Sequence, residues 1–198
     1  MDSRRLYLIT PAGPDLAELL EAAIAGGVDV VQIREKSLDD RTLLCRLAVA
    51  RDVTARCGVP LVVNDRIDLA LLAEADYVHL GQDDVPVEAA RGFEMPVGLS
   101  THTADQIAAA DADYIGVGPV FETPTKQGRP AVGLDLVRHA VSAATIPWFA
   151  IGGIDSDNAA EVVAAGATRL AVVRAIASAE DPERAAASLC EVLDSQLP

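Results

Sequence analysis

Only two lysines occur in the chain, although sixteen of its residues are Lys or Arg. Lys36 ends the sequence VQIREK, and Lys126 lies much later in the sequence TPTKQGR. A compact ammonium suits clustered oxygen atoms such as those of phosphate, and Arg does not replace it freely. Side chains alternate along a strand, so Gln32, Arg34 and Lys36 would share one face unless these end residues are merely solvated. The pattern predicts that both lysines face one anionic substrate.

Two aspartates could hold a metal ion. Asp65 follows the apolar sequence LVVN, and Asp84 ends the sequence HLGQDD. Hard oxygen ligands without a His or thiolate partner suit Mg²⁺, which prefers one or two carboxylates together with substrate phosphate and water. The alternative is that Asp65 and either Asp83 or Asp84 cap the helices that follow them. The cations expected at the same opening favour a metal–diphosphate cluster.

A second phosphate site is predicted at the glycine pair of the sequence AIGGI. Gly152 and Gly153 have no Cβ, so backbone N–H groups there could approach an anion, and a helix-like turn at residues 174–178 would add a favourable dipole. A glycine pair also ends many strands without any function. The prediction therefore depends on where the pair lies in the fold.

The elements that must position these residues form a regular series. Apolar stretches cover residues 6–10, 28–34, 60–64, 77–80, 96–100, 114–118, 147–151 and 169–173. Helical patterns cover residues 15–25, 39–56, 66–75, 86–91, 104–110, 134–144, 158–165 and 183–193. The strands are apolar throughout, which is typical of parallel strands covered on both faces.

Eight such alternations predict an α/β fold, a (β/α)8 TIM barrel that forms a single domain over residues 1–198. An open doubly wound sheet is the alternative, and it is disfavoured because no strand has the polar pattern of an edge. In a barrel, chemistry lies at the carboxyl ends of the strands, and polar residues follow six consecutive strands here. The glycine pair would follow the seventh strand, where barrels often bind phosphate.

Composition excludes several classes of partner. The net charge of −14 argues against nucleic acid and anionic membranes, and no apolar run is long enough to span a bilayer. No secretory signal is evident at the start, and three scattered cysteines without metal spacing predict reduced thiols in a cytoplasmic protein. A homo-oligomer is left open. The acidity predicts either adaptation to high salt or a compositional bias, which activity at low salt would separate.

The motifs VQIREK, VNDR, HLGQDD, GLSTHT, GVGPVFETPTKQGRPAVGLD and AIGGI together resemble those of the thiamine-phosphate synthase family, over nearly the whole chain. That family is a (β/α)8 barrel that uses Mg²⁺. It joins 4-amino-2-methyl-5-hydroxymethylpyrimidine diphosphate to 4-methyl-5-(2-phosphoethyl)thiazole and releases thiamine phosphate and pyrophosphate. The resemblance implies a transferase whose partners are these small molecules.

The resemblance also implies a role for each matching residue. The pyrimidine diphosphate would contact Gln32, Ile33, Arg34, Glu35, Lys36, Asn64, Ser100 and Lys126, and the thiazole phosphate would contact Thr123, Thr125, Gly153, Val173 and Arg174. Mg²⁺ would bind Asp65 and Asp84. In an SN1-like transfer, Arg34, Lys36 and Lys126 would be catalytic because they receive the charge of the departing pyrophosphate. Arg174 departs from members with a small polar residue there, which a backbone N–H contact would tolerate.

Three other functions compete. A thiazole tautomerase on the same barrel could use His102 for proton transfer, although a packing or hydrogen-bonding role for His102 is the commoner one. A non-catalytic thiamine-precursor binding protein would bind without turnover. A sugar-phosphate isomerase would need an acid–base pair, and Glu35 and Glu122 lack evident partners.

Overall fold

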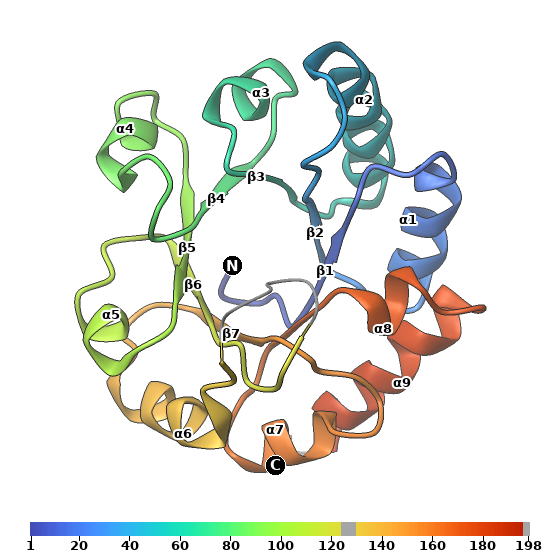
Figure 1. The fold of residues 1–198 in the computed structure, drawn as a ribbon. Coiled ribbons are helices and arrows are strands. Elements are labelled where there is room, and N and C mark those ends of the chain that lie inside the picture. The colour runs from blue at the N-terminus through green and yellow to red at the C-terminus, as the bar shows by residue number, and fades with distance from the viewer. Residues whose placement is uncertain (124–129, 196–198) are drawn as a thin grey trace.

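A computed structural model of the chain describes residues 1–123 and 130–195. Eight parallel strands are hydrogen-bonded in sequence order, and the last pairs with the first, so the sheet closes into a barrel. Figure 1 looks along the barrel, with the strands as an inner ring and the helices outside it. The predicted (β/α)8 barrel is therefore confirmed. The open doubly wound sheet is excluded.

The strands are short and follow one another with helices between them. They are β1 Leu6–Thr10, β2 Val30–Ile33, β3 Leu61–Asn64, β4 Tyr77–Leu80, β5 Val97–Thr101, β6 Tyr114–Val117, β7 Trp148–Ile151 and β8 Leu170–Val172. The helices are α1 Leu16–Ala25, α2 Asp40–Cys57, α3 Ile67–Leu72, α4 Val87–Arg91, α5 Ala104–Ala108, α6 Gly133–Ala143, α7 Ala159–Ala164, α8 Arg174–Ala177 and α9 Pro182–Asp194. None of these helices is long and apolar enough to cross a lipid bilayer.

Local signals set several of these boundaries. The Asp39 side chain accepts the backbone N–H of Thr42 and caps the start of α2, and Gly58 ends that helix with a φ of 66°. Strand β2 is shorter than the apolar stretch 28–34, because Arg34 already lies in the loop that leads to α2. The turn predicted at residues 174–178 is the short helix α8.

Side chains of the strands pack into two separate cores. Alternate residues such as Leu8, Val31 and Val63 point outward and pack against the helices. The intervening residues point into the barrel, where Tyr7, Tyr114 and other side chains form a second cluster. Because both faces of the sheet are covered, this arrangement requires strands that are apolar on both faces.

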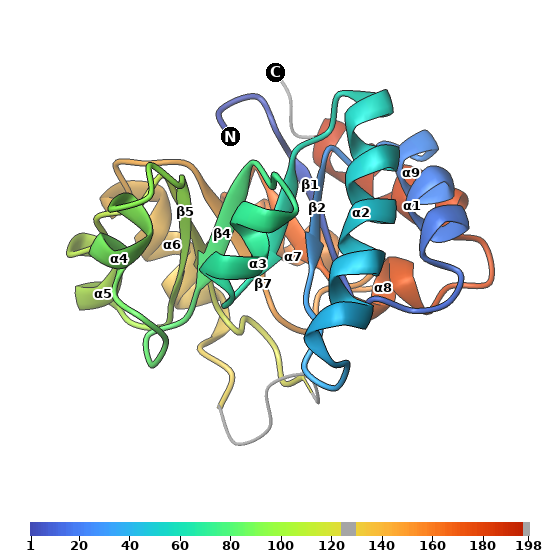
Figure 2. The ribbon, with the colours of Figure 1, turned by 90° about the horizontal axis from the view of Figure 1, so that it is seen from above.

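Carboxylates fasten three pairs of strands at the end of the barrel where the strands begin. Asp29 accepts the N–H groups of Arg5 and Leu6 at 2.8 and 3.0 Å. Asp76 accepts the N–H of Leu61, and Asp113 accepts that of Val97. Figure 2 shows the barrel from the side, with the N-terminus at this end and the loops that follow the strands at the other.

Candidate active site

A cavity of about 300 Å³ opens at the carboxyl ends of the strands. Its lining includes one inward-facing residue from each strand or the residue that follows it: Ile9, Gln32, Asn64, His79, Ser100, Gly116, Ile151 and Val173. These positions follow from the period of two along each strand. Gln32, Asn64 and Ser100, which are predicted to contact the pyrimidine, thus line the same cavity.

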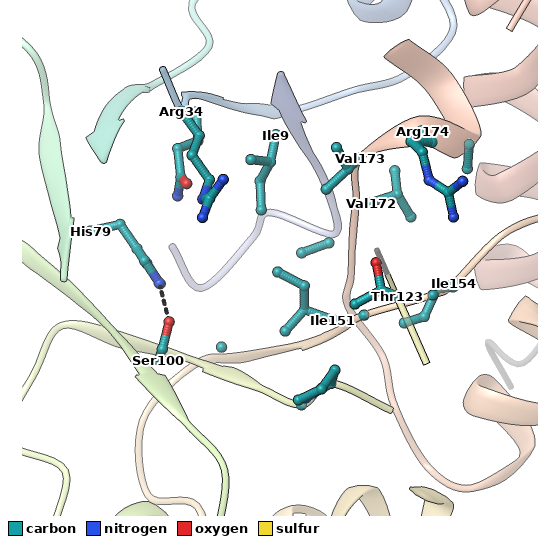
Figure 3. A pocket seen from close by; sticks show the side chains of 18 of the residues that line it. Ile9, Arg34, His79, Ser100, Thr123, Ile151, Ile154, Val172, Val173 and Arg174 are labelled. Atoms are coloured by element: carbon teal, nitrogen blue, oxygen red, sulfur yellow. Dashed lines mark hydrogen bonds between the residues drawn. The ribbon is translucent and has the colours of Figure 1, made fainter. Parts of the chain in front are cut away.

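Arg34 and Arg174 bring positive charge to the cavity from two sides. In Figure 3 the Arg34 guanidinium lies near His79 and Ile9, and Arg174 lies near Thr123 and Ile154. Neither guanidinium has a hydrogen-bond or ion-pair partner within residues 1–123 and 130–195. In a chain of net charge −14, two such cations on one cavity favour an anionic ligand.

A cluster of Lys36, Asp65 and Asp84 lies beyond the ends of β2, β3 and β4. The Lys36 Nζ is 3.1 Å from the Asp65 Oδ2. Burial raises the pKa of the Asp65 carboxyl above its ordinary value, the neighbouring Asp84 carboxyl adds to this rise, and Lys36 opposes it. A carboxyl whose pKa is raised by a second carboxyl beside it, as that of Asp65 is by Asp84, marks a site suited to a cation.

The structure excludes the helix-capping alternative for these aspartates. Helix α3 begins after Arg66, α4 begins after Pro86, and neither start has a side-chain cap. Asp65 instead has a φ of 63°, in the left-handed region that non-glycine residues rarely adopt. Asp84 accepts the backbone N–H of Gly81 at 2.7 Å. Strain of this kind is concentrated at functional sites, which supports a binding role for Asp65.

The predicted phosphate-binding residues line the far end of the cavity. Thr123, Gly153, Val173 and Arg174 all belong to its wall. Gly153 has a φ of 65°, and a Cβ there would lie 2.8 Å from the carbonyl oxygen of Glu122. Only glycine fits this position, so the backbone of this turn stays open to a ligand.

Two predicted residues lie elsewhere, and two others cannot be placed. Ile33 packs outward in the core between the sheet and the helices and does not line the cavity. Glu35 accepts the backbone N–H of Ala12 and of Lys36, and hydrogen bonds, above all from the Ser37 hydroxyl, lower the pKa of its carboxyl. It therefore organises the loop after β2. Thr125 and Lys126 lie outside the described residues.

Two histidines also line the cavity. His102 donates from Nδ1 to the carbonyl oxygen of Gly118, in keeping with a hydrogen-bonding role. His79 was not among the residues predicted from the sequence, yet its Nε2 is 3.0 Å from the Ser100 Oγ. The available signal was the period of two along β4, which puts His79 on the same inward face as Tyr77.

A (β/α)8 barrel with cations and a carboxylate pair at the carboxyl ends of its strands defines a class of enzymes that act on phosphorylated small molecules. Comparison with known proteins narrows this class. The family model described as thiamine monophosphate synthase matches residues 6–176. The chain belongs to the thiamine monophosphate synthase family.

Individual relatives agree with this assignment. A thiamine-phosphate synthase of Thermobifida fusca is 54% identical over 200 residues, which cover 96% of this chain and 92% of the relative. A thiamine-phosphate synthase of Gloeobacter violaceus is 52% identical over 196 residues, 96% of this chain but 58% of the relative. The chain thus spans little more than half the length of the second protein.

A solved structure is also similar. It is a thiamine phosphate pyrophosphorylase from Pyrococcus furiosus, with 33% identity, a TM-score of 0.89, and 98% of this chain and 97% of that one covered. These relatives indicate a transferase enzyme that acts on small molecules. They favour thiamine-phosphate synthesis over the tautomerase and over a non-catalytic binding protein.

Proposed function

We propose that the chain joins 4-amino-2-methyl-5-hydroxymethylpyrimidine diphosphate to 4-methyl-5-(2-phosphoethyl)thiazole, giving thiamine phosphate and pyrophosphate. The observation that carries this proposal is the contact of Lys36 with the Asp65–Asp84 pair beside a cavity that Arg34 enters. A diphosphate and its counter-ion need cations and carboxylates at one opening. An isomerase or a simple phosphate-binding protein has no need of the carboxylate pair.

The reaction is an alkyl transfer with dissociative character. The 4-amino group pushes electrons toward the exocyclic CH₂, the carbon–oxygen bond breaks, and the electron pair leaves with pyrophosphate. The thiazole nitrogen then forms the new bond with its lone pair. Arg34 and Lys36 receive the negative charge that develops on the leaving oxygen atoms. From the sequence alone, we predict the same role for Lys126.

Asp65 and Asp84 are the residues that would hold Mg²⁺. Their carboxylate oxygens are the ligands that a hard cation prefers, and the two carboxyl groups lie close enough for Asp84 to raise the pKa of Asp65. No group of three or more His, Cys, Asp or Glu that could hold a metal occurs in the described part of the chain, so substrate phosphate and water would complete the coordination. When bound, the ion supplies Lewis-acid stabilisation of the departing pyrophosphate.

The two ends of the cavity divide the substrates between them. Arg34, Asn64 and Ser100 would bind the pyrimidine diphosphate, and Thr123, Gly153, Val173 and Arg174 would bind the thiazole phosphate. The Arg174 side chain lines the cavity, so it can add its own charge to any backbone contact at that position. A cytoplasmic location and the oligomeric state stay predictions.

The deciding experiment mixes both phosphorylated substrates with the protein and Mg²⁺ and measures released pyrophosphate. We expect release that stops on addition of EDTA and returns with excess Mg²⁺, and no release when the thiazole phosphate is omitted. The absence of pyrophosphate under the complete conditions would rule out the proposed reaction. Metal-independent conversion of the thiazole phosphate alone would instead establish the tautomerase.

A further inference from the structure

Arg66, the residue after Asp65, joins the loop that follows β3 to the start of α2. Its guanidinium makes two parallel hydrogen bonds to the Asp40 carboxylate, Nη1 to Oδ1 at 2.8 Å and Nη2 to Oδ2 at 3.0 Å. It also donates to Asp68 in α3, from Nε at 2.8 Å and from Nη2 at 2.6 Å. These hydrogen bonds lower the pKa of both carboxyls. One side chain thus ties together the neighbouring helices α2 and α3 (Figure 1).

The backbone of Arg66 closes the turn that holds Asp65. Its N–H donates to the carbonyl oxygen of Asn64 at 2.8 Å, so Asp65 is the central residue of a three-residue turn. The φ of 63° at Asp65 belongs to the rare and strained form of such a turn. A strained residue persists only where the surrounding structure holds it in place. The carboxylates that anchor Arg66 therefore also support the conformation of Asp65.

Two ion pairs connect the loops that follow β2 and β3. In one, the Lys36 Nζ is 3.1 Å from the Asp65 Oδ2. In the other, Arg66, which directly follows Asp65, binds Asp40, the first residue of the helix after the Lys36 loop. Under the proposed function Lys36 contacts the diphosphate and Asp65 holds Mg²⁺, so the first pair is exchanged for contacts with the ligands. The pair of Arg66 and Asp40 then still joins the two loops.

We propose that Arg66 is a positioning residue, which by binding Asp40 holds the loops of Lys36 and Asp65 in the arrangement that binds Mg²⁺ and the diphosphate. The inference rests on the proposed function, since it takes a metal and a diphosphate as the ligands. A planar guanidinium with two parallel hydrogen bonds fixes both distance and orientation, whereas an ammonium acts as a point charge. The effect should therefore depend on the shape of the side chain as well as on its charge.

Arg56 offers a matched comparison within the same chain. Like Arg66 it is an exposed guanidinium that contacts two carboxylates, Glu21 at 2.9 Å and Asp52 at 3.3 Å. It lies in the last turn of α2, away from the residues that line the cavity. Exposed ion pairs contribute little to stability, so substitutions at either arginine should change the unfolding temperature by similarly small amounts.

The test measures the dissociation constant of inorganic pyrophosphate by calorimetry in excess Mg²⁺, so that no reaction is needed. The proteins are the wild type, Arg66→Lys, Asp40→Asn, and the controls Arg56→Lys and Asp52→Asn. Thermal unfolding without metal or pyrophosphate shows that each variant is folded. Arg66→Lys keeps the positive charge, so a change in its affinity reports the lost geometry.

We expect Arg66→Lys to bind pyrophosphate about 10–100-fold more weakly than the wild type, as is typical when a residue that supports metal ligands is lost. Asp40→Asn should weaken binding to a similar degree. Electrostatics alone predicts the opposite sign for this variant, because removing a negative charge favours an anion. The two controls should stay within about twofold of the wild type.

Three results would overturn the proposal: wild-type affinity in Arg66→Lys, tighter binding by Asp40→Asn, or a wild type that does not bind pyrophosphate with Mg²⁺. An equal loss in Arg56→Lys would also do so, since it would reveal a general effect of surface ion pairs. Failure of the proposed function is recognised separately. A wild type that binds pyrophosphate but releases none from the two substrates would disprove the reaction and leave the positioning role of Arg66 intact.

Discussion

The Asp65–Asp84 pair shows how single residues are placed for chemistry. Asp65 is held in a left-handed backbone conformation, and its N–H donates to the carbonyl oxygen of His79 at 2.9 Å. Its carboxyl contacts both Lys36 and Asp84. Such an arrangement places two negative groups together, which opposes folding, and Lys36 supplies only one positive charge against the two. Selection for binding rather than for stability explains this conflict.

Asp84→Asn tests this explanation at the scale of one residue. The amide keeps the shape of the side chain and an oxygen that can accept the Gly81 N–H, but it removes one charge from the pair. We expect pyrophosphate release to fall by about 10²–10³-fold. The unfolding temperature should stay constant or rise, since repulsion with Asp65 is relieved. Steady-state kinetics and calorimetry measure the two effects.

Asp105→Asn is the matched control for this substitution. Asp105 is an exposed residue in the first turn of α5, away from the residues that line the cavity. Its loss should leave turnover unchanged. Near-normal turnover in Asp84→Asn, measured over a range of Mg²⁺ concentrations, would remove Asp84 from the proposed metal site.

At the scale of elements, the aspartates that precede β2, β4 and β6 make the same hydrogen bond to a neighbouring strand. Asp29, Asp76 and Asp113 each accept the N–H of the first residue of the preceding strand. In front of β8 the polarity is reversed, because the Arg169 guanidinium donates to the carbonyl oxygens of Arg4 and Asp2. These contacts lie at the end of the barrel opposite the cavity, where residues serve stability.

Asp29→Ala should destabilise the protein without affecting catalysis. It leaves the partly buried N–H groups of Arg5 and Leu6 without their acceptor, which costs about 1–3 kcal/mol in the free energy of unfolding. Urea denaturation measures this loss, and kcat should match the wild type. A large fall in kcat with unchanged stability would contradict a purely structural role.

The pH dependence of that loss has a definite sign. Burial raises the pKa of Asp29 in the folded protein above the unfolded value of 3.8, so the folded state holds the proton more tightly. The contribution of this proton to stability is complete below pH 3.8 and is lost as the pH rises through the folded pKa. The stability difference between wild type and Asp29→Ala should therefore be larger in acid than at neutral pH.

At the scale of the whole molecule, the sequence was sufficient for the architecture. Eight apolar stretches that alternate with helical patterns predict a sheet closed into a barrel. The carboxyl ends of its strands then bring Gln32, Asn64 and Ser100 together. The hydrogen bonds inside the barrel that join Gln32 to Tyr7 and Tyr7 to Tyr114 were not predicted. In a strand that is apolar throughout, the inward and outward faces look alike until the barrel closes, so partners across the interior cannot be assigned.

The net charge of the chain is also a property of the whole molecule. Thirty carboxylates face sixteen Lys and Arg, and many of those cations already pair with carboxylates on the surface, as Arg56 does with Glu21 and Asp52. The remaining carboxylates repel one another and favour expansion of the chain. Salt shortens the range of this repulsion from roughly 30 Å at 0.01 M to about 3 Å at 1 M.

We therefore expect the unfolding temperature to rise with KCl over this range, measured by calorimetry. Sucrose is the control, because it stabilises by exclusion from the surface without screening charge. Activity distinguishes the two origins of the acidity: a chain adapted to high salt loses pyrophosphate release at low KCl, whereas a compositional bias leaves it intact. An unfolding temperature that is insensitive to KCl would mean that the charge excess is spread too thinly over the surface to oppose folding.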